Sequence, residues 1–128
     1  MHTHDIHEVL RGVAELRVSR SMTDHHAMSG MQALGQFNQC LLGLVRFSGL
    51  TPWERHPGGD ELLHVLEGEV EVTLLADEGP IHASLRVGSV CVVPSGLWHR
   101  QHAARGAVAL LFATPVDGGE TSWADDPR

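Results

Sequence analysis

The chain has 128 residues and an apolar fraction of 42%, which suits one globular domain with a single core. Its 16 acidic and 9 basic residues give a formal charge of −7, which excludes the basic face that nucleic acids and acidic membranes require. Aromatic residues make up only 5% of the chain, so platforms for stacking single-stranded nucleic acid are scarce too.

The N-terminal segment, residues 1–36, is expected to form a short helix and an arm. Apolar residues recur at helical spacing between Ile6 and Val13, which predicts a helix over residues 5–16. Residues 19–36 show no defensible periodicity and predict a loosely packed arm. The histidines of this whole segment, including the adjacent pair at 25 and 26, are interpreted as surface residues.

From residue 38 onward, short apolar runs alternate with turn residues. The runs predict strands at 38–48, 61–68, 69–76, 81–87, 89–94 and 107–115. The breaks between them lie at 57–59, 77–79, Gly88, 94–96 and 105–106. Many short strands with frequent turns predict an all-β sandwich or barrel over residues 37–115. A polar tail, 116–128, follows, and Trp123 is expected to pin it to the surface.

Cys40 and Cys91 both lie in apolar stretches and form no CxxC pair, which predicts two buried, reduced thiols. The first residues contain no apolar core of a secretory signal. The longest apolar run, 107–113, is too short to span a bilayer. We therefore expect a cytoplasmic protein with no membrane partner.

The stretch WERHPGGDELLHVLEG places acidic and imidazole side chains around a turn. Glu54 and His56 fall on one face of a strand, because strand side chains alternate with period two. The turn at 57–59 reverses the chain, so Glu61 can lie opposite that pair. A second turn, at Pro94 to Gly96, lets His99 enter from a distant part of the chain. Imidazole nitrogens and carboxylates that converge in this way suit a divalent transition metal.

The spacing of these residues resembles the two motifs of the cupin superfamily, over residues 40–115. The first motif is usually written G-x5-H-x-H-x3,4-E-x6-G, and the chain has Glu54-x-His56-x4-Glu61-x6-Gly68. The second is usually G-x5-P-x-G-x2-H-x3-N, and the chain has Gly88-x5-Pro94-x-Gly96-x2-His99. The chain departs from these motifs at three positions. Gly49 is one residue too close to serve as the leading glycine of the first motif, Glu54 replaces its first histidine, and Ala103 replaces the asparagine of the second motif.

The resemblance implies a cupin-type double-stranded β-helix, a jelly-roll barrel preceded by the short N-terminal helix and arm. It implies a divalent transition metal (Mn, Fe, Ni or Zn) held by Glu54, His56, Glu61 and His99. It also implies a homodimer. Small single-domain cupins include oxygenases, isomerases and lyases that act on small polar molecules, so a small-molecule ligand or substrate is the expected partner.

Glu54 has three possible roles. As a ligand, it would give a site of two imidazoles and two carboxylates, which neutralises a divalent ion and favours harder ions such as Mn²⁺ or Fe²⁺ over Cu. As a catalytic general base, it would stand beside a triad of two histidines and one carboxylate. In the third case it forms an ion pair with a residue such as Arg46, and the barrel holds no metal.

Other residues are assigned by strand parity. Gln101 shares the parity of His99 and is a candidate substrate-orienting group. Phe47 and Leu63 are further candidates, for cavity walls, although such residues more commonly belong to the barrel core. His64 and His102 have the opposite parity and are not expected to be ligands.

Two functional classes remain open. One is a metal-dependent enzyme, with Glu54 or Glu61 moving a proton. The other is a non-catalytic module that binds or senses a small molecule, with a degenerate or empty metal site.

Overall fold

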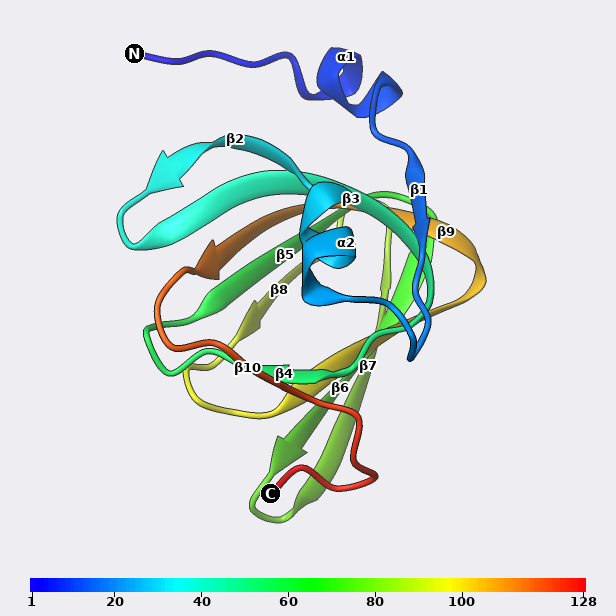
Figure 1. Cartoon of the computed structure of the whole chain (residues 1–128), viewed down its shortest axis with the longest axis vertical. Coiled ribbons are helices and arrows are strands. Elements are labelled where there is room, and N and C mark those ends of the chain that lie inside the picture. Colours follow the sequence, from blue (N-terminus) through cyan, green and yellow to red (C-terminus); the bar gives the residue numbers. More distant parts are fainter.

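The computed structural model describes residues 1–128, and most of them belong to β-strands (Figure 1). In chain order the elements are α1 (Ile6–Arg11), β1 (Glu15–Arg17), α2 (Asp24–Ser29), β2 (Gln32–Phe37), β3 (Cys40–Leu50), β4 (Trp53–Arg55), β5 (Glu61–Glu67), β6 (Glu69–Ala76), β7 (Gly79–Arg86), β8 (Val90–Val93), β9 (His99–Pro115) and β10 (Glu120–Ser122). The strands form the all-β jelly roll that the sequence predicted.

The long strand β9 joins the two halves of the jelly roll. Its first half pairs with β6 and with β4, and its second half lies between β3 and β5. The pairing with β3 shifts between Ala103 and Val108, where Gly106 has a φ of 120°. Such a bulge bends a strand and re-aims its side chains. The break expected at 105–106 is therefore a bulge inside one continuous strand.

The N-terminal segment is more ordered than the sequence predicted. The helix expected over 5–16 ends at Arg11, because Gly12 caps it with its backbone N–H, and residues 15–17 form β1 instead. Strand β1 then pairs in parallel with β3. The arm expected over 19–36 contains α2, whose N-cap is Thr23, and most of β2, which pairs with β3. Strand β2 thus crosses the expected boundary between residues 36 and 37.

Two apolar clusters stabilise these elements. The larger one fills the barrel interior with side chains such as Val45, Phe47, Leu63 and Leu110. In the smaller one, helix α1 packs Leu10 against residues of β2, β3 and β9, including the fully buried Leu44. Helix α2 lies in front of the barrel (Figure 1). Its partly buried Ala27 packs against the larger cluster.

The two cysteines are free, as predicted, but Cys40 and Cys91 are only half-buried. Cys40 begins β3, between β2 and β9, and Cys91, in β8, packs against the larger apolar cluster. None of the helices is long and apolar enough to cross a membrane.

Candidate metal centre

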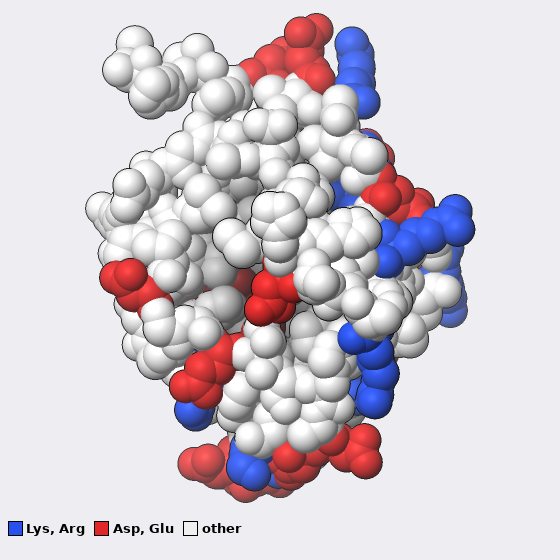
Figure 2. All heavy atoms as spheres, in the orientation of Figure 1, with Lys and Arg blue, Asp and Glu red and all other residues white.

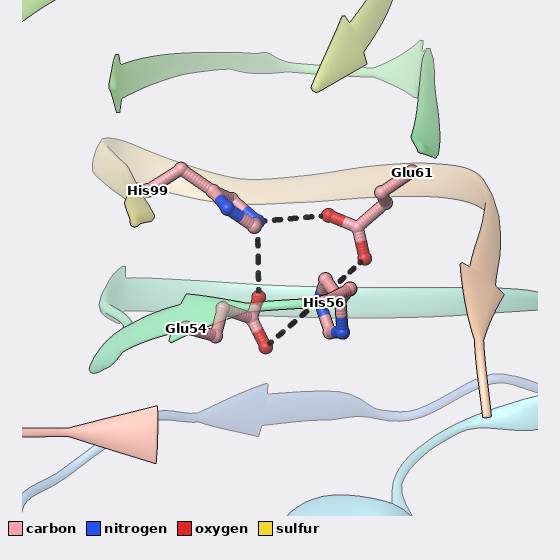
Figure 3. Close-up of side chains that lie close together, drawn as sticks. All are labelled: Glu54, His56, Glu61 and His99. Atoms are coloured by element: carbon pink, nitrogen blue, oxygen red, sulfur yellow. Dashed lines mark hydrogen bonds and ion pairs between the residues drawn. The ribbon is translucent and has the colours of Figure 1, made fainter. Parts of the chain in front are cut away.

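Four side chains from three parts of the chain converge at one end of the barrel interior (Figure 3). Glu54 belongs to β4, His56 directly follows it, Glu61 begins β5 and His99 begins β9. One potential ligand atom from each lies within 4.8 Å of the others. His99 is fully buried, and only 3% of Glu61 and 8% of His56 are exposed. The structure therefore brings together the four residues that the motif spacing singled out.

The two turns that present the histidines are hydrogen-bonded to each other. The backbone N–H of Gly96 donates to the carbonyl oxygen of His56 over 3.0 Å. The hydroxyl of Ser95 donates to the carbonyl oxygens of His56 and Pro57, and the backbone N–H of Ser95 donates to the Asp60 carboxylate over 2.9 Å. These bonds fix the position of His56 relative to the turn that leads to His99.

Glu61 is the central carboxylate of the cluster. Its Oε1 lies 3.0 Å from Nε2 of His99, and its Oε2 lies 3.3 Å from Nε2 of His56. Glu54 lies farther from the same two nitrogens, at 3.8 Å from that of His99 and 3.9 Å from that of His56. Its side chain is also more exposed, at 27% against 4% for Glu61. Both imidazoles thus direct one nitrogen between two carboxylates.

The hydrogen bond at the far side of His99 fixes its protonation. Nδ1 of His99 lies 3.2 Å from the carbonyl oxygen of Leu97, which can only accept, so Nδ1 carries a proton. In a neutral ring, Nε2 would then face Glu61 with a lone pair. That contact is favourable only if Nε2 is also protonated or if a cation lies between the two groups. Metal-binding histidines commonly have this backbone bond on their second nitrogen.

The imidazole of His56 gives independent evidence that the cluster binds an ion. Both of its ring nitrogens are buried, and neither has a hydrogen bond. The approach to Glu61 is close but lacks the alignment of a hydrogen bond. A buried polar atom without a partner costs free energy, so such atoms are rare unless water or an ion satisfies them. The donor set therefore fits a metal ion.

The charges of the cluster are strongly coupled. Burial and the neighbouring Glu61 charge raise the pKa of Glu54 to about 7. Burial also opposes the ionisation of Glu61, but its interactions with His56 and His99 outweigh this and lower its pKa to about 2. Burial disfavours the charged forms of His56 and His99, yet the carboxylates raise the pKa of both rings. Without a metal, protons on the histidines balance the carboxylates, and a divalent ion could take their place.

Thr114 joins this cluster, although sequence reasoning missed it. Its hydroxyl donates to Oε2 of Glu61 over 2.6 Å. Thr114 lies near the end of β9, in the apolar run AVALLFATP. A single hydroxyl in that run was the available signal. It orients the carboxylate, as supporting hydrogen bonds do around metal ligands.

A cavity of about 350 Å³ adjoins the cluster. The three residues that the sequence suggested for a pocket all line it, and so do both carboxylates of the cluster. They are Gln101, Phe47 and Leu63, with Glu54 and Glu61. His56 and His99 are not in the lining, so the cavity reaches the cluster from the side of its carboxylates.

The remaining residues considered from the sequence make their contacts outside the cluster. Arg46 pairs with Glu67 and not with Glu54, so the ion pair suggested for Glu54 is wrong. His64 bonds to the carbonyl oxygen of Ser89, away from the cluster. The other predicted non-ligands, the N-terminal histidines and His102, are exposed as expected.

Comparisons with known proteins identify the family. The sequence model of the Cupin domain matches residues 45–114, more than half of the chain. The chain belongs to the cupin superfamily. It is 37% identical over 65 residues to auxin-binding protein ABP19a of Prunus persica, which covers 50% of this chain but only 31% of that protein.

Two solved structures share the fold. A cupin-2 domain protein of Shewanella frigidimarina is 21% identical with a TM-score of 0.57, over 74% of this chain and 94% of that one. Hydroquinone 1,2-dioxygenase PnpCD, in complex with Cd²⁺ and 4-hydroxybenzonitrile, is 25% identical with a TM-score of 0.55, over 66% of this chain and 63% of that one.

Proposed function

We propose that the protein is a metal-dependent cupin enzyme of the oxygenase type, which acts on a small molecule bound in the cavity beside the metal. The observation that carries this proposal is the buried His56, whose two ring nitrogens have no hydrogen-bond partner next to two carboxylates. The likeness to a hydroquinone dioxygenase supports the reaction class.

His56, Glu61 and His99 would hold the ion, with Thr114 orienting Glu61. This is the arrangement of two histidines and one carboxylate that leaves coordination positions open. When bound, a divalent ion would supply Lewis-acid and redox chemistry to the adjoining cavity. Among Mn, Fe, Ni and Zn, the oxygen donors and the reaction class favour Mn²⁺ or Fe²⁺.

Glu54 is assigned the role of proton acceptor in this proposal. It lines the cavity, it lies farther from the imidazoles than Glu61, and it is the more exposed of the two carboxylates. Both carboxylates line the cavity, but Thr114 and the histidines already engage Glu61, so Glu54 is the one left to accept a substrate proton.

The first experiment is elemental analysis of protein purified without a histidine tag. We expect about one Mn or Fe per chain, lost in His56→Ala and kept in the control His64→Ala, which removes a histidine bonded elsewhere on β5. If Glu54→Gln keeps the metal but loses activity, Glu54 acts as a general base. If Glu54→Gln loses the metal, Glu54 is a metal ligand. If the parent chain takes up no divalent metal, the proposal fails.

A second candidate is a non-catalytic module that binds a small molecule. The cavity favours it, because its walls need no metal to bind an apolar ligand. Ligand binding to the metal-loaded chain without turnover of any bound molecule would favour this module. The homodimer that the resemblance implied stays a prediction.

A further inference from the structure

The cavity beside the cluster has mainly apolar walls. Strands β3, β5 and β9 contribute side chains such as Val45, Leu63 and Phe112, and helix α2 closes another side with Ala27 and Met28. Figure 2 shows a hollow in this face of the molecule. A volume of about 350 Å³ is near the lower end of ligand pockets, which run from about 300 to 1,000 Å³. The space therefore suits a compact ligand.

The charges that line the cavity are all acidic. They are Glu54 and Glu61 at the cluster and Asp24 at the start of α2. Neither an arginine nor a histidine lines the cavity, and the chain has no lysine. Arg46 and Arg55, the basic residues nearest to the first motif, pair with Glu67 and Glu120 instead. A divalent ion would balance the two glutamates, but the lining itself holds no cation for an anionic group elsewhere in the cavity. The nearest one identified is the exposed Arg20, which stacks on the lining residue Trp123.

Gln101 adds one neutral polar group to the cavity. It is 6% exposed, and its Oε1 is buried without a hydrogen-bond partner. Its backbone is held by Thr51, which accepts from the Gln101 N–H over 2.9 Å and donates its own N–H to the Gln101 carbonyl oxygen. The side-chain amide is thus fixed at its base. At its end, Oε1 can accept a hydrogen bond from a ligand hydroxyl, and Nε2 can donate one to a ligand oxygen.

Resting on the proposed function, we infer that the ligand is a compact molecule with an apolar body, of about the size of one substituted ring, and a single oxygen-donor end. The oxygen end faces the metal and the Gln101 amide, and the apolar body lies against the walls from β3, β5, β9 and α2. No second charged group is present on the ligand.

Two physical arguments favour this ligand over the small polar molecule that the resemblance suggested. A two- or three-carbon acid would leave most of the apolar wall uncovered, and apolar contact is the main source of affinity in such pockets. A dianion would hold its second charge among apolar walls and the acidic Asp24, with no cation in the lining to pair with it, and an unpaired charge held away from water is strongly unfavourable.

Three carboxylic acids test the inference on the manganese-loaded protein by calorimetry. 4-Methylbenzoate has the apolar ring and one carboxylate, terephthalate adds a second carboxylate at the far end, and glycolate lacks the ring. We expect 4-methylbenzoate to bind at least about a hundredfold more tightly than terephthalate, because the second charge stays unpaired. Glycolate should bind at least about tenfold more weakly than 4-methylbenzoate.

Three variants test whether 4-methylbenzoate binds in this cavity. Ala27→Trp fills the cavity from α2 and should abolish binding of 4-methylbenzoate, whereas His25→Trp on the exposed side of the same helix should leave it unchanged. Gln101→Leu should weaken binding of 4-methylbenzoate by about two- to tenfold, as expected for one lost hydrogen bond. All three variants should bind manganese like the parent.

The outcomes separate this inference from the proposed function. If the protein binds manganese but glycolate or terephthalate binds as tightly as 4-methylbenzoate, the inference is overturned and the proposed function stands. If the protein binds no metal, the proposed function fails, and 4-methylphenol, an uncharged probe, is titrated into the metal-free chain. Binding of 4-methylphenol that Ala27→Trp removes supports the apolar ligand, and no binding overturns it.

Discussion

Thr114 donates its hydroxyl to Oε2 of Glu61 over 2.6 Å, across a separation of 53 residues in the chain. The bond fixes the carboxylate that contacts both His56 and His99. It therefore links the last part of β9 to the metal site.

Replacing Thr114 by valine should weaken metal binding without unfolding the protein. The side chain keeps its shape, but Glu61 loses a donor, and lost supporting bonds typically cost ten- to a hundredfold in metal affinity. We expect the dissociation constant for Mn²⁺ to rise about tenfold, measured by competition with a chelator. Thr114→Ser, which keeps the hydroxyl, is the control. Equal affinity in Thr114→Val and the parent would contradict a positioning role.

The metal-free protein should lose stability as the pH rises from about 5 to 8. The folded state raises the pKa of His56 and of His99, so their contribution to stability is full below about 6.5 and is lost as the pH rises through the folded values. Glu54 acts in the same direction, because a pKa raised to about 7 makes its ionisation above pH 4.5 more costly in the folded state. Glu61, with a pKa of about 2, contributes stability throughout this range.

Urea unfolding of the metal-free chain between pH 5 and 8 measures this dependence. We expect the free energy of unfolding to fall by at least about 1 kcal/mol, and Glu54→Gln to reduce the fall. With Mn²⁺ in excess the trend should reverse, because the metal displaces the ligand protons and binds more tightly at higher pH. A flat profile for the metal-free parent would show that these four groups are not coupled as described.

Asp60 should stabilise the contact between the two turns. Its carboxylate accepts the backbone N–H of Ser95, next to the bonds that hold His56. Asp60→Ala should lower the free energy of unfolding by about 1 kcal/mol. Asp60→Asn, which keeps an acceptor oxygen, should lose less. If urea unfolding shows the two variants to be equal, the hydrogen bond is not the source of the effect.

Arg46 should stabilise the N-terminal helix and leave the metal site unaffected. Its guanidinium donates to the carbonyl oxygens of Leu10 and Val13, at the end of α1, and pairs with Glu67. Arg46→Met should cost about 2 kcal/mol of stability, because hydrogen bonds to a charged group are lost at two carbonyls. Glu67→Gln removes only an exposed ion pair and should cost less than about 1 kcal/mol. Loss of metal in Arg46→Met would contradict this separation.

The strands, the turns and the shared face of Glu54 and His56 could be predicted because they follow local rules, whereas the full set of four clustered residues was implied by the resemblance to the two cupin motifs. Period-two alternation sets the faces of Glu54 and His56, and proline- and glycine-containing turns mark where the chain reverses. The same parity separated Gln101, which lines the cavity, from His102, which is exposed.

The remaining features depend on contacts between distant segments. Strand β2 has only one buried residue, Leu34, so its sequence lacks the apolar alternation that would predict a strand. The strand forms because this segment pairs with β3. Helix α1 ends early at the Gly12 cap, and Leu16 then reaches the core from β1. No local pattern encodes the parallel pairing of β1 with β3. The bond from Thr114 to Glu61 likewise exists only after β9 pairs with β5.

The long strand β9 gives the protein a built-in order of assembly. It supplies His99 at its first residue and Thr114 near its last. Its bulge separates the half that pairs with β4 and β6 from the half that pairs with β5. During synthesis, the chain cannot complete the metal site until nearly all of the barrel has left the ribosome. Such distant pairings form late because they close long loops. Metal capture by a growing chain would therefore require at least that His99 has left the ribosome.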